Sequence, residues 1–219
     1  MFFTSMIKNI IVKLRTMFNL LKKPQNVNIM GGFFKMKKVS FDIDRKSSLK
    51  VVLGKVAKLN NLKFYIRGAG HFVKIGEGVR ISSGIIWMED TNCKVIIGDR
   101  TTIEQVEFAC TEPSSEINIG SDCMFSRGIE LRTGDSHSIF DMNTKKRINY
   151  AQNINVGNKV WVGAHSRILK GVHIESEVVI GIGSLVLNGN VLKSNSVYGG
   201  VPAKMLKSNV TWDRQRIYK

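Results

Sequence analysis

Cysteine, proline and long apolar runs are scarce in this 219-residue chain. The 3 cysteines, Cys93, Cys110 and Cys123, have no CxxC spacing, which argues against a disulfide framework, a redox pair and a metal site. No apolar run reaches the roughly 18 residues that a membrane-spanning helix needs. The first residues do not form a secretory signal, so we expect a reduced, cytoplasmic protein that is not exported.

Acidic residues are also few. Lysine and arginine number 33 against 17 aspartates and glutamates, which gives a formal net charge of +16. Such an excess attracts anionic partners and raises their concentration near the surface. Nucleic acid, an acidic membrane, a phosphorylated cofactor and a polyanionic sugar all meet this condition, so charge alone does not choose among them.

The N-terminal segment, residues 1–52, predicts an amphipathic basic helix followed by an irregular stretch with short strands. Apolar residues recur at helical spacing from Ile7 to Leu21, and basic residues occupy most of the other face. Pro24 ends this pattern because proline has no N–H to donate. We favour a helix packed on its own protein or on a neighbouring subunit, and peripheral association with the inner membrane surface is the alternative.

Residues 53–202 carry an internal repeat. Four aliphatic-glycine pairs begin at Leu53, Ile75, Ile97 and Ile119, at intervals of 22 residues, which is three hexads plus a four-residue corner extension. Further along, every sixth residue is apolar: Val156, Val162, Ile168, Ile174, Ile180, Val186, Leu192 and Tyr198. No α-helix produces a six-residue period. The repeat predicts a mainly β protein, a parallel β-helix whose inward side chains stack from coil to coil.

One interruption breaks the repeat. Ile119 and Val156 are 37 residues apart, one coil of 18 residues plus 19 more, so we expect a loop at residues 132–153. His137 lies near its start. Imidazole suits general-base catalysis because its pKa lies near working pH, and Asp135 or a backbone carbonyl is suited to hold its second nitrogen. An exposed histidine without a catalytic role is the alternative.

The other three histidines occupy corner or non-anchor positions, so we expect His71, His165 and His173 on the surface. No histidine or cysteine pair has the spacing of metal ligands, which predicts a protein without a metal. The chain also lacks a GxSxG elbow, a P-loop and a dinucleotide fingerprint.

Together these features resemble the hexapeptide-repeat acyltransferases. The resemblance rests on the hexads, on His137 within Asp-Ser-His-Ser-Ile, on Val160-Trp-Val-Gly-Ala-His165 and on Gly200-Val-Pro-Ala-Lys204. The stretch from Asp-Ser-His-Ser-Ile to Trp-Val-Gly looks similar to the sialic-acid-polymer O-acetyltransferases of encapsulated bacteria. The family implies a left-handed β-helix, a homotrimer with sites between subunits, and acetyl-CoA as the donor. We expect residues 203–219 to form a short C-terminal helical tail.

The resemblance also assigns catalytic roles. His137 matches the base that removes the proton from the acceptor hydroxyl, and Trp161 matches a position beside that site with a role in catalysis and cofactor binding. A hydrophobic residue that shields a coil corner is the alternative for Trp161.

Four further positions match cofactor contacts of the family. Ala164 and Ile182 match backbone positions, one coil apart, that line the pantetheine groove. Lys204 and Lys207 match basic positions near the CoA phosphates, with ordinary solvated charge as the alternative.

Basic residues near the loop suggest the acceptor. Arg127, Arg132, Lys145, Lys146 and Arg147 favour an anionic polysaccharide, and we expect polysialic acid because each of its units carries a carboxylate. A neutral sugar or a lipopolysaccharide unit is the alternative acceptor. A non-enzymatic nucleic-acid or membrane binder is a third interpretation, but it leaves the histidine loop unexplained, and we expect no nucleic-acid partner. No residue stands out as a covalent acetyl carrier, so we expect direct transfer.

Overall fold

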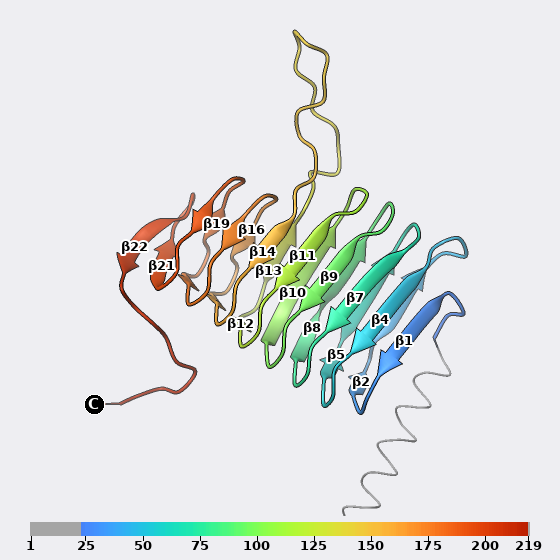
Figure 1. The fold of residues 1–219 in the computed structure, drawn as a ribbon, viewed down its shortest axis with the longest axis horizontal. Coiled ribbons are helices and arrows are strands. Elements are labelled where there is room, and N and C mark those ends of the chain that lie inside the picture. Colours follow the sequence, from blue (N-terminus) through green and yellow to red (C-terminus); the bar gives the residue numbers. More distant parts are fainter. Residues whose placement is uncertain (1–22, 219) are drawn as a thin grey trace, which may run out of the picture.

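A computed structural model describes residues 23–218, which form short strands stacked in coils along one axis (Figure 1). The predicted helix at residues 7–21 lies outside this range. One sheet of 8 parallel strands makes the first face of the coil. Its strands are β1 (Val27–Gly31), β4 (Leu49–Leu53), β7 (His71–Ile75), β9 (Lys94–Ile97), β11 (Glu116–Ile119), β14 (Ile154–Val156), β17 (His173–Ile174) and β20 (Val191–Leu192).

A second sheet of 14 strands covers the two remaining faces. The second face holds β2 (Lys35–Lys37), β5 (Lys58–Asn60), β12 (Met124–Phe125), β15 (Trp161–Val162), β18 (Val179–Ile180) and β21 (Ser196–Gly199). The third face holds β3 (Ser40–Ile43), β6 (Leu62–Ile66), β13 (Ile129–Arg132), β16 (Arg167–Ile168) and β19 (Leu185–Val186). Strands β8 (Arg80–Met88) and β10 (Thr102–Cys110) continue across both, since β8 pairs with β5 and β6 and β10 pairs with β12 and β13.

The 22-residue interval is the coil register. Leu53 pairs with Ile75, Ile75 with Ile97 and Ile97 with Ile119, and all four side chains are buried. Ile119 then pairs directly with Val156. The 37-residue interval therefore adds one coil and one loop, as the sequence predicts.

The hexad anchors fill the interior of the later coils, and all eight, from Val156 to Tyr198, are buried. Each fully buried aliphatic side chain contributes about 1.5–3 kcal/mol relative to exposure. Adjacent coils also satisfy each other's backbone groups, as where the Gly163 N–H donates to the Ile180 carbonyl at 2.8 Å. Stacking thus provides both the buried core and the backbone hydrogen bonds that a single coil lacks.

Glycine follows the anchors where successive coils approach most closely. A Cβ on Gly54 would lie 2.3 Å from the Glu77 nitrogen, and one on Gly120 would lie 2.4 Å from the Gly157 oxygen. Non-bonded atoms do not approach so closely, so these corners require a residue without a side chain.

Both ends of the coil differ from the sequence prediction. β1 pairs with β4 from Val27 and Leu49 onward, so coiling begins upstream of residue 53. The predicted helical tail at residues 203–219 is wrong. β22 (Lys204–Ser208) pairs antiparallel with β21, and the residues that follow, up to 218, are not helical. The exposed edge of the sheet supplies hydrogen-bond partners for this backbone, which a helix would otherwise supply internally.

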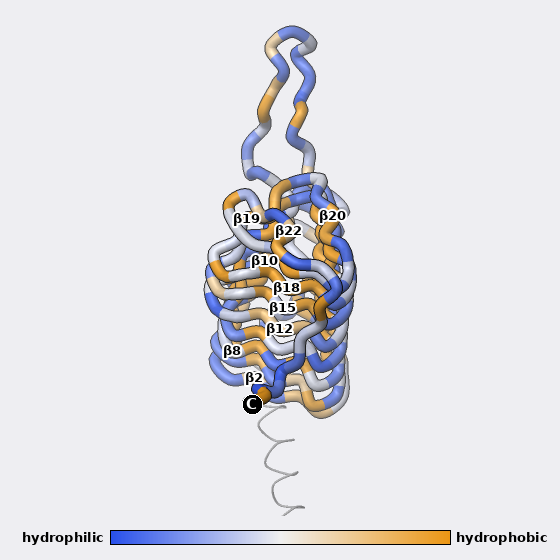
Figure 2. The backbone as a smooth tube through the Cα atoms, turned by 90° about the vertical axis from the view of Figure 1, so that its left-hand side faces the viewer, coloured by the Kyte–Doolittle hydropathy of each residue, from blue (hydrophilic) through white to orange (hydrophobic). Residues whose placement is uncertain are grey.

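Residues 133–153, between β13 and β14, leave the coil as the predicted loop. They project far from the stacked strands and carry hydrophilic and hydrophobic residues alike (Figure 2). Within residues 23–218 no helix has the length and apolar character needed to cross a membrane.

Candidate active site

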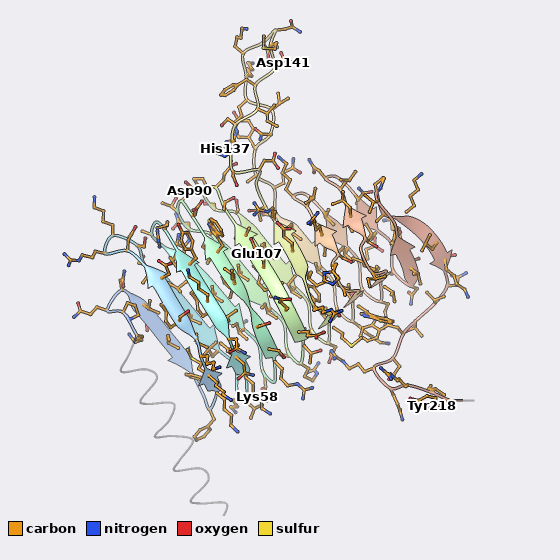
Figure 3. The ribbon with its side chains drawn as sticks, turned by 180° about the vertical axis from the view of Figure 1, so that it is seen from behind. Lys58, Asp90, Glu107, His137, Asp141 and Tyr218 are labelled. Carbon is orange, nitrogen blue, oxygen red and sulfur yellow. The ribbon has the colours of Figure 1, made fainter. Side chains whose placement is uncertain are left out.

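His137 is exposed at the base of the projecting loop, with Asp141 close to its tip (Figure 3). Its backbone is held on both sides. The His137 N–H donates to the Asp135 carbonyl at 2.8 Å, and the His137 carbonyl accepts a hydrogen bond from Asn149 Nδ2 at 2.7 Å. Among the described residues, its imidazole ring has no hydrogen-bond partner, so the loop presents both ring nitrogens to whatever approaches.

Asn149 organises the loop base. It is 7% exposed and bonds through both ends of its amide: Oδ1 accepts from the Ile139 N–H at 2.7 Å, and Nδ2 also donates to Asp135 Oδ2 at 2.9 Å. Lys170, from the next coil, donates to the Asn149 carbonyl at 3.1 Å and to Asp135 Oδ2 at 2.5 Å. These contacts fix the path of the chain through His137.

Asp135 does not orient the histidine ring as the sequence suggested. Its carboxylate bonds to Lys170 and Asn149 instead. Burial raises the pKa of the Asp135 carboxyl, but hydrogen bonds from Lys170 and Asn149 outweigh that effect, so the pKa lies below its ordinary value. Asp135 is therefore an ionised structural group of the loop base.

Arg147 anchors the returning strand of the loop. Its guanidinium makes two hydrogen bonds to the Glu112 carboxylate, one of them at 3.0 Å from Nη1 to Oε2, and its Nε donates to Asn149 Oδ1 at 3.1 Å. The Glu112 carboxylate also accepts from the Ala151 N–H at 3.3 Å. Such a planar, bidentate pair fixes geometry as well as charge, so Arg147 is committed to the fold of the loop.

The structure separates the five basic residues predicted to bind the acceptor. Lys145 and Lys146 are exposed near the loop tip, and no described residue pairs with either ammonium group. Arg132, in contrast, lies on the third face and pairs with Glu107 and Glu130. Arg127 is in the turn between β12 and β13, at the opposite end of β13 from the loop. On the loop itself, only these two lysines carry a positive charge without an ion pair among the described residues.

Trp161 opens β15 on the second face and is 38% exposed. His137 leaves the coil between the third and first faces, at a different corner, and no hydrogen bond joins the two residues within the described chain. The ring of Trp161 instead faces Trp212, with ring centroids 5.9 Å apart and an interplanar angle of 49°.

Ala164 and Ile182 lie one coil apart, at the corner that ends the second face. The Gly183 N–H donates to the Ala164 carbonyl at 2.8 Å, which links the two turns. The N–H groups of Ala164 and Ile182 have no hydrogen-bond partner among residues 23–218. Lys204 and Lys207 are exposed on β22, opposite Gly199 and Val197 of β21.

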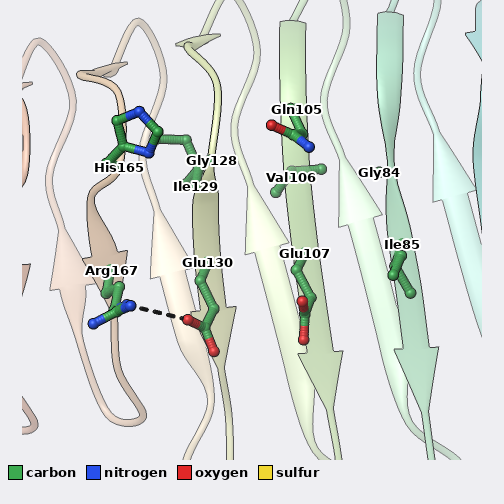
Figure 4. Close-up of a pocket in the computed structure, with 10 residues that line it drawn as sticks. All are labelled: Gly84, Ile85, Gln105, Val106, Glu107, Gly128, Ile129, Glu130, His165 and Arg167. Atoms are coloured by element: carbon green, nitrogen blue, oxygen red, sulfur yellow. Dashed lines mark ion pairs between the residues drawn. The ribbon is translucent and has the colours of Figure 1, made fainter.

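A groove of about 270 Å³ lies where the third face begins, across β8, β10, β13 and β16 (Figure 4). Its polar lining is Gln105, Glu107, Glu130, His165 and Arg167. Arg167 Nε lies 3.3 Å from Glu130 Oε2. The side chains of Gln105 and His165 have no hydrogen-bond partner within the described residues, which leaves them free to bond to a hydroxyl group.

The remaining three histidines differ in exposure. His165 and His173 are exposed, as expected, but the surface prediction for His71 is wrong. His71 is 1% exposed, because it opens β7 on the inward side of the strand, and its Nε2 lies 2.9 Å from the Arg67 carbonyl oxygen. No group of three metal-binding side chains exists among residues 23–218.

Several structural residues escaped the sequence analysis. Asn149, Lys170 and Glu112 have polar side chains, and nothing in their spacing shows that they converge across three coils. Trp212 lies in a segment predicted to be helical. Only the break in the hexad pattern pointed to the region as a whole.

A stack of hexapeptide coils, interrupted once by a loop that presents a histidine, defines the class of hexapeptide-repeat acyltransferases. No family model matches the chain. The polysialic acid O-acetyltransferase of Neisseria meningitidis is 33% identical over 165 residues, which are 75% of each chain. The enzyme of the same name from Escherichia coli O1:K1 is 36% identical over 143 residues, which are 65% of this chain and 45% of the relative.

A solved structure gives the same result. The polysialic-acid-specific acetyltransferase NeuO superposes with a TM-score of 0.70 at 33% identity, and the match covers 86% of this chain and 88% of that one. The chain therefore belongs to the polysialic acid O-acetyltransferase family. It spans less than half of the Escherichia coli relative's length.

Proposed function

We propose that this protein transfers an acetyl group from acetyl-CoA to a hydroxyl of polysialic acid. The observation that carries the proposal is the match to the Neisseria meningitidis enzyme, at 33% identity over 75% of both chains. The fold agrees with that of the polysialic-acid-specific acetyltransferase NeuO. The left-handed sense of the coil, a cytoplasmic location and the use of His137 as the base are parts of the same proposal.

Exposed apolar side chains support the proposed homotrimer. On the loop, Ile139, Phe140, Met142, Ile148 and Tyr150 are each more than half exposed. Apolar residues gathered on a projecting segment mark a surface that another chain covers. A second copy that covers this loop would also bring its own second face, with Trp161 and Ala164, to the His137 of its neighbour, which one chain alone does not do.

The second face fits the donor. The free N–H groups of Ala164 and Ile182 are suited to bond to the amide carbonyls of a pantetheine arm. Lys204 and Lys207, on β22, are suited to hold the CoA phosphates as compact positive charges. Acetyl-CoA supplies an activated thioester, and these residues bind and orient it.

His137 then acts as a general base. Its neutral ring nitrogen takes the proton of the acceptor hydroxyl as that oxygen attacks the thioester carbonyl, the C–S bond breaks, and the proton passes to the departing CoA thiolate. The oxyanion formed on the way requires donors, and free N–H groups of the coil are suited to that role. Cys93, Cys110 and Cys123 are all buried, so none is placed to carry the acetyl group covalently. This supports direct transfer of the acetyl group.

The acceptor has a second candidate. Because Arg132 and Arg147 are neutralised by glutamates, the loop carries less free positive charge than the sequence suggests, and a neutral sugar or lipopolysaccharide unit remains the alternative. To test the function itself, the protein is incubated with acetyl-CoA and polysialic acid, and the polymer is examined for new O-acetyl groups by NMR. Acetylated polymer supports the proposal, and unmodified polymer at high enzyme concentration contradicts it.

Complementation tests the shared site. His137→Ala and Trp161→Ala chains, each of low activity alone, are unfolded together and refolded as mixed trimers. If one site uses His137 of one subunit and Trp161 of the next, some mixed sites contain both native residues and activity returns. Continued inactivity of a well-folded mixed trimer contradicts a shared site.

A further inference from the structure

The C-terminal segment crosses the coils on its way out. Residues 209–216, here called the strap, run from β22 back past β18, β15 and β12 toward earlier coils (Figure 2). The Val210 N–H donates to the Asn195 carbonyl at 2.9 Å, in the same corner that contains Glu177 one coil back, Lys159 two coils back and Asp122 beyond that. The strap therefore lies along the corner between the first and second faces.

Side chains fasten the strap on both sides of Trp212. On one side, Thr211 Oγ1 donates to Glu177 Oε2 at 2.6 Å, and Lys159 Nζ lies 3.0 Å from the same oxygen. On the other side, Arg214 donates to Thr102 Oγ1 and to the Cys123 carbonyl, both at 2.6 Å. Together with the Val210–Asn195 hydrogen bond, these contacts link five successive coils to one segment.

Trp212 is the inward-facing residue of the strap. It is 8% exposed, and its Nε1 donates to the Lys159 carbonyl at 2.8 Å, two residues before Trp161. Its ring contacts that of Trp161 at a tilt of 49°. The Arg214 guanidinium lies 5.9 Å from the centre of the Trp212 ring on the strap itself.

On its own face, Trp161 has only smaller neighbours to fix its orientation. It belongs to a strand of two residues, and its neighbours on the face are the smaller side chains Met124 and Val179. A partly exposed indole in such a row has room to change rotamer. The ring of Trp212, fixed by its own hydrogen bond, closes one side of that space.

We propose that Trp212 is a positioning residue: held by the strap, it sets the ring of Trp161 beside the acetyl-CoA site proposed at Ala164 and Ile182. The proposal rests on the proposed function only for its consequence, which is that loosening Trp212 weakens the binding of acetyl-CoA. The contact itself is independent of the reaction.

The test compares Trp212→Ala and Trp212→Phe in the full-length protein, with Tyr218→Ala, beyond the strap and 81% exposed, as the control. Near-UV circular dichroism reports the coupling of the two indoles, and Trp161→Phe identifies the part of the spectrum that belongs to the pair. We expect Trp212→Ala to remove that signal. We also expect it to raise the KM for acetyl-CoA roughly two- to tenfold, as for the loss of one aromatic pair, with a smaller change in kcat.

Trp212→Phe should have a KM for acetyl-CoA close to that of the wild type, since a phenyl ring fills the same side of Trp161. An unchanged spectrum and KM in Trp212→Ala would overturn the proposal. A purely structural role would also overturn it. In that case Trp212→Ala and Trp212→Phe would lose kcat equally, both would have a lowered melting temperature, and the KM would not change. If the wild-type protein releases no CoA thiol with any acceptor, the proposed function fails, while the spectrum still decides whether Trp212 holds Trp161.

Discussion

The ammonium group of Lys170 donates a hydrogen bond to the carboxylate of Asp135 at 2.5 Å and so ties the base of the histidine loop to the next coil. The Lys170 side chain is only 11% exposed, so removal of the Asp135 carboxylate leaves the buried ammonium group without a counter-ion. We expect Asp135→Asn to lower the free energy of unfolding by about 1–3 kcal/mol, measured in urea. Asp213→Asn, at an exposed carboxylate without an ion pair in the described chain, should change it little. Equal stability of the Asp135 variant and the wild type would contradict this role.

The same contact predicts a pH dependence. The folded pKa of Asp135 lies below its ordinary value of 3.8, so the carboxylate contributes stability that is fully present above that value and is lost as the pH falls through the folded pKa. The stability difference between wild type and Asp135→Asn should therefore be constant from neutral pH to about pH 5 and shrink below about pH 4. A difference that grows on acidification would contradict the assignment.

His137→Ala should lower kcat by roughly 10²- to 10⁴-fold, because the loss of a general base removes that much of the rate. The binding of acetyl-CoA should be retained. His173→Ala provides the control, since His173 is an exposed histidine on β17 of the first face. The two variants are compared by CoA-thiol release and by titration with CoA. Comparable activity of both would exclude His137 as the base.

Lys145 and Lys146 should attract an anionic acceptor over a distance. Replacement of both by alanine is expected to raise the KM for polysialic acid at low salt and to flatten its salt dependence, because fewer charges steer the polymer. The control replaces Lys50 and Lys74, exposed lysines on β4 and β7 of the first face. KM is measured from low to moderate ionic strength. Identical salt profiles for the two double variants would show that the loop lysines do not meet the polymer.

Arg147 and Glu112 should behave as one structural unit. We expect Arg147→Gln and Glu112→Gln each to destabilise the protein, and the double variant to lose less than the sum of the two, because the second substitution removes a partner that is already lost. Urea unfolding of all four chains measures the coupling. Additive losses of unfolding free energy, with a KM for the acceptor that rises only in Arg147→Gln, would contradict this. They would instead support the prediction that Arg147 binds the acceptor.

The sequence predicted the coil well because its signal is periodic. Leu53, Ile75, Ile97 and Ile119 differ by a constant interval, and side chains at a constant interval in a stacked coil must lie above one another. The loop was equally predictable, since any insertion shifts the register by a countable number of residues. Such features depend on spacing alone.

Other features depend on which side chains meet, and spacing does not reveal that. Arg147 looked like one of several free cations, but Glu112, 35 positions earlier, lies against it once the coils stack. Trp212 follows the hexads and was assigned to a helix. Its indole instead packs along a corner of the coil, against Trp161 and the Lys159 carbonyl. His71 was expected on the surface because it was assigned to a corner extension, but it is the first residue of β7 and its side chain points inward.

The central claim is that the chain acetylates an acidic polysaccharide from acetyl-CoA. The most direct measurement is the rate of CoA-thiol release with polysialic acid, sialic acid monomer and neutral sugars as acceptors, with His137→Ala as the blank. We predict the highest kcat/KM for polysialic acid and loss of that activity in the blank. Equal or faster release with neutral sugars, or the same release in His137→Ala, would contradict the account.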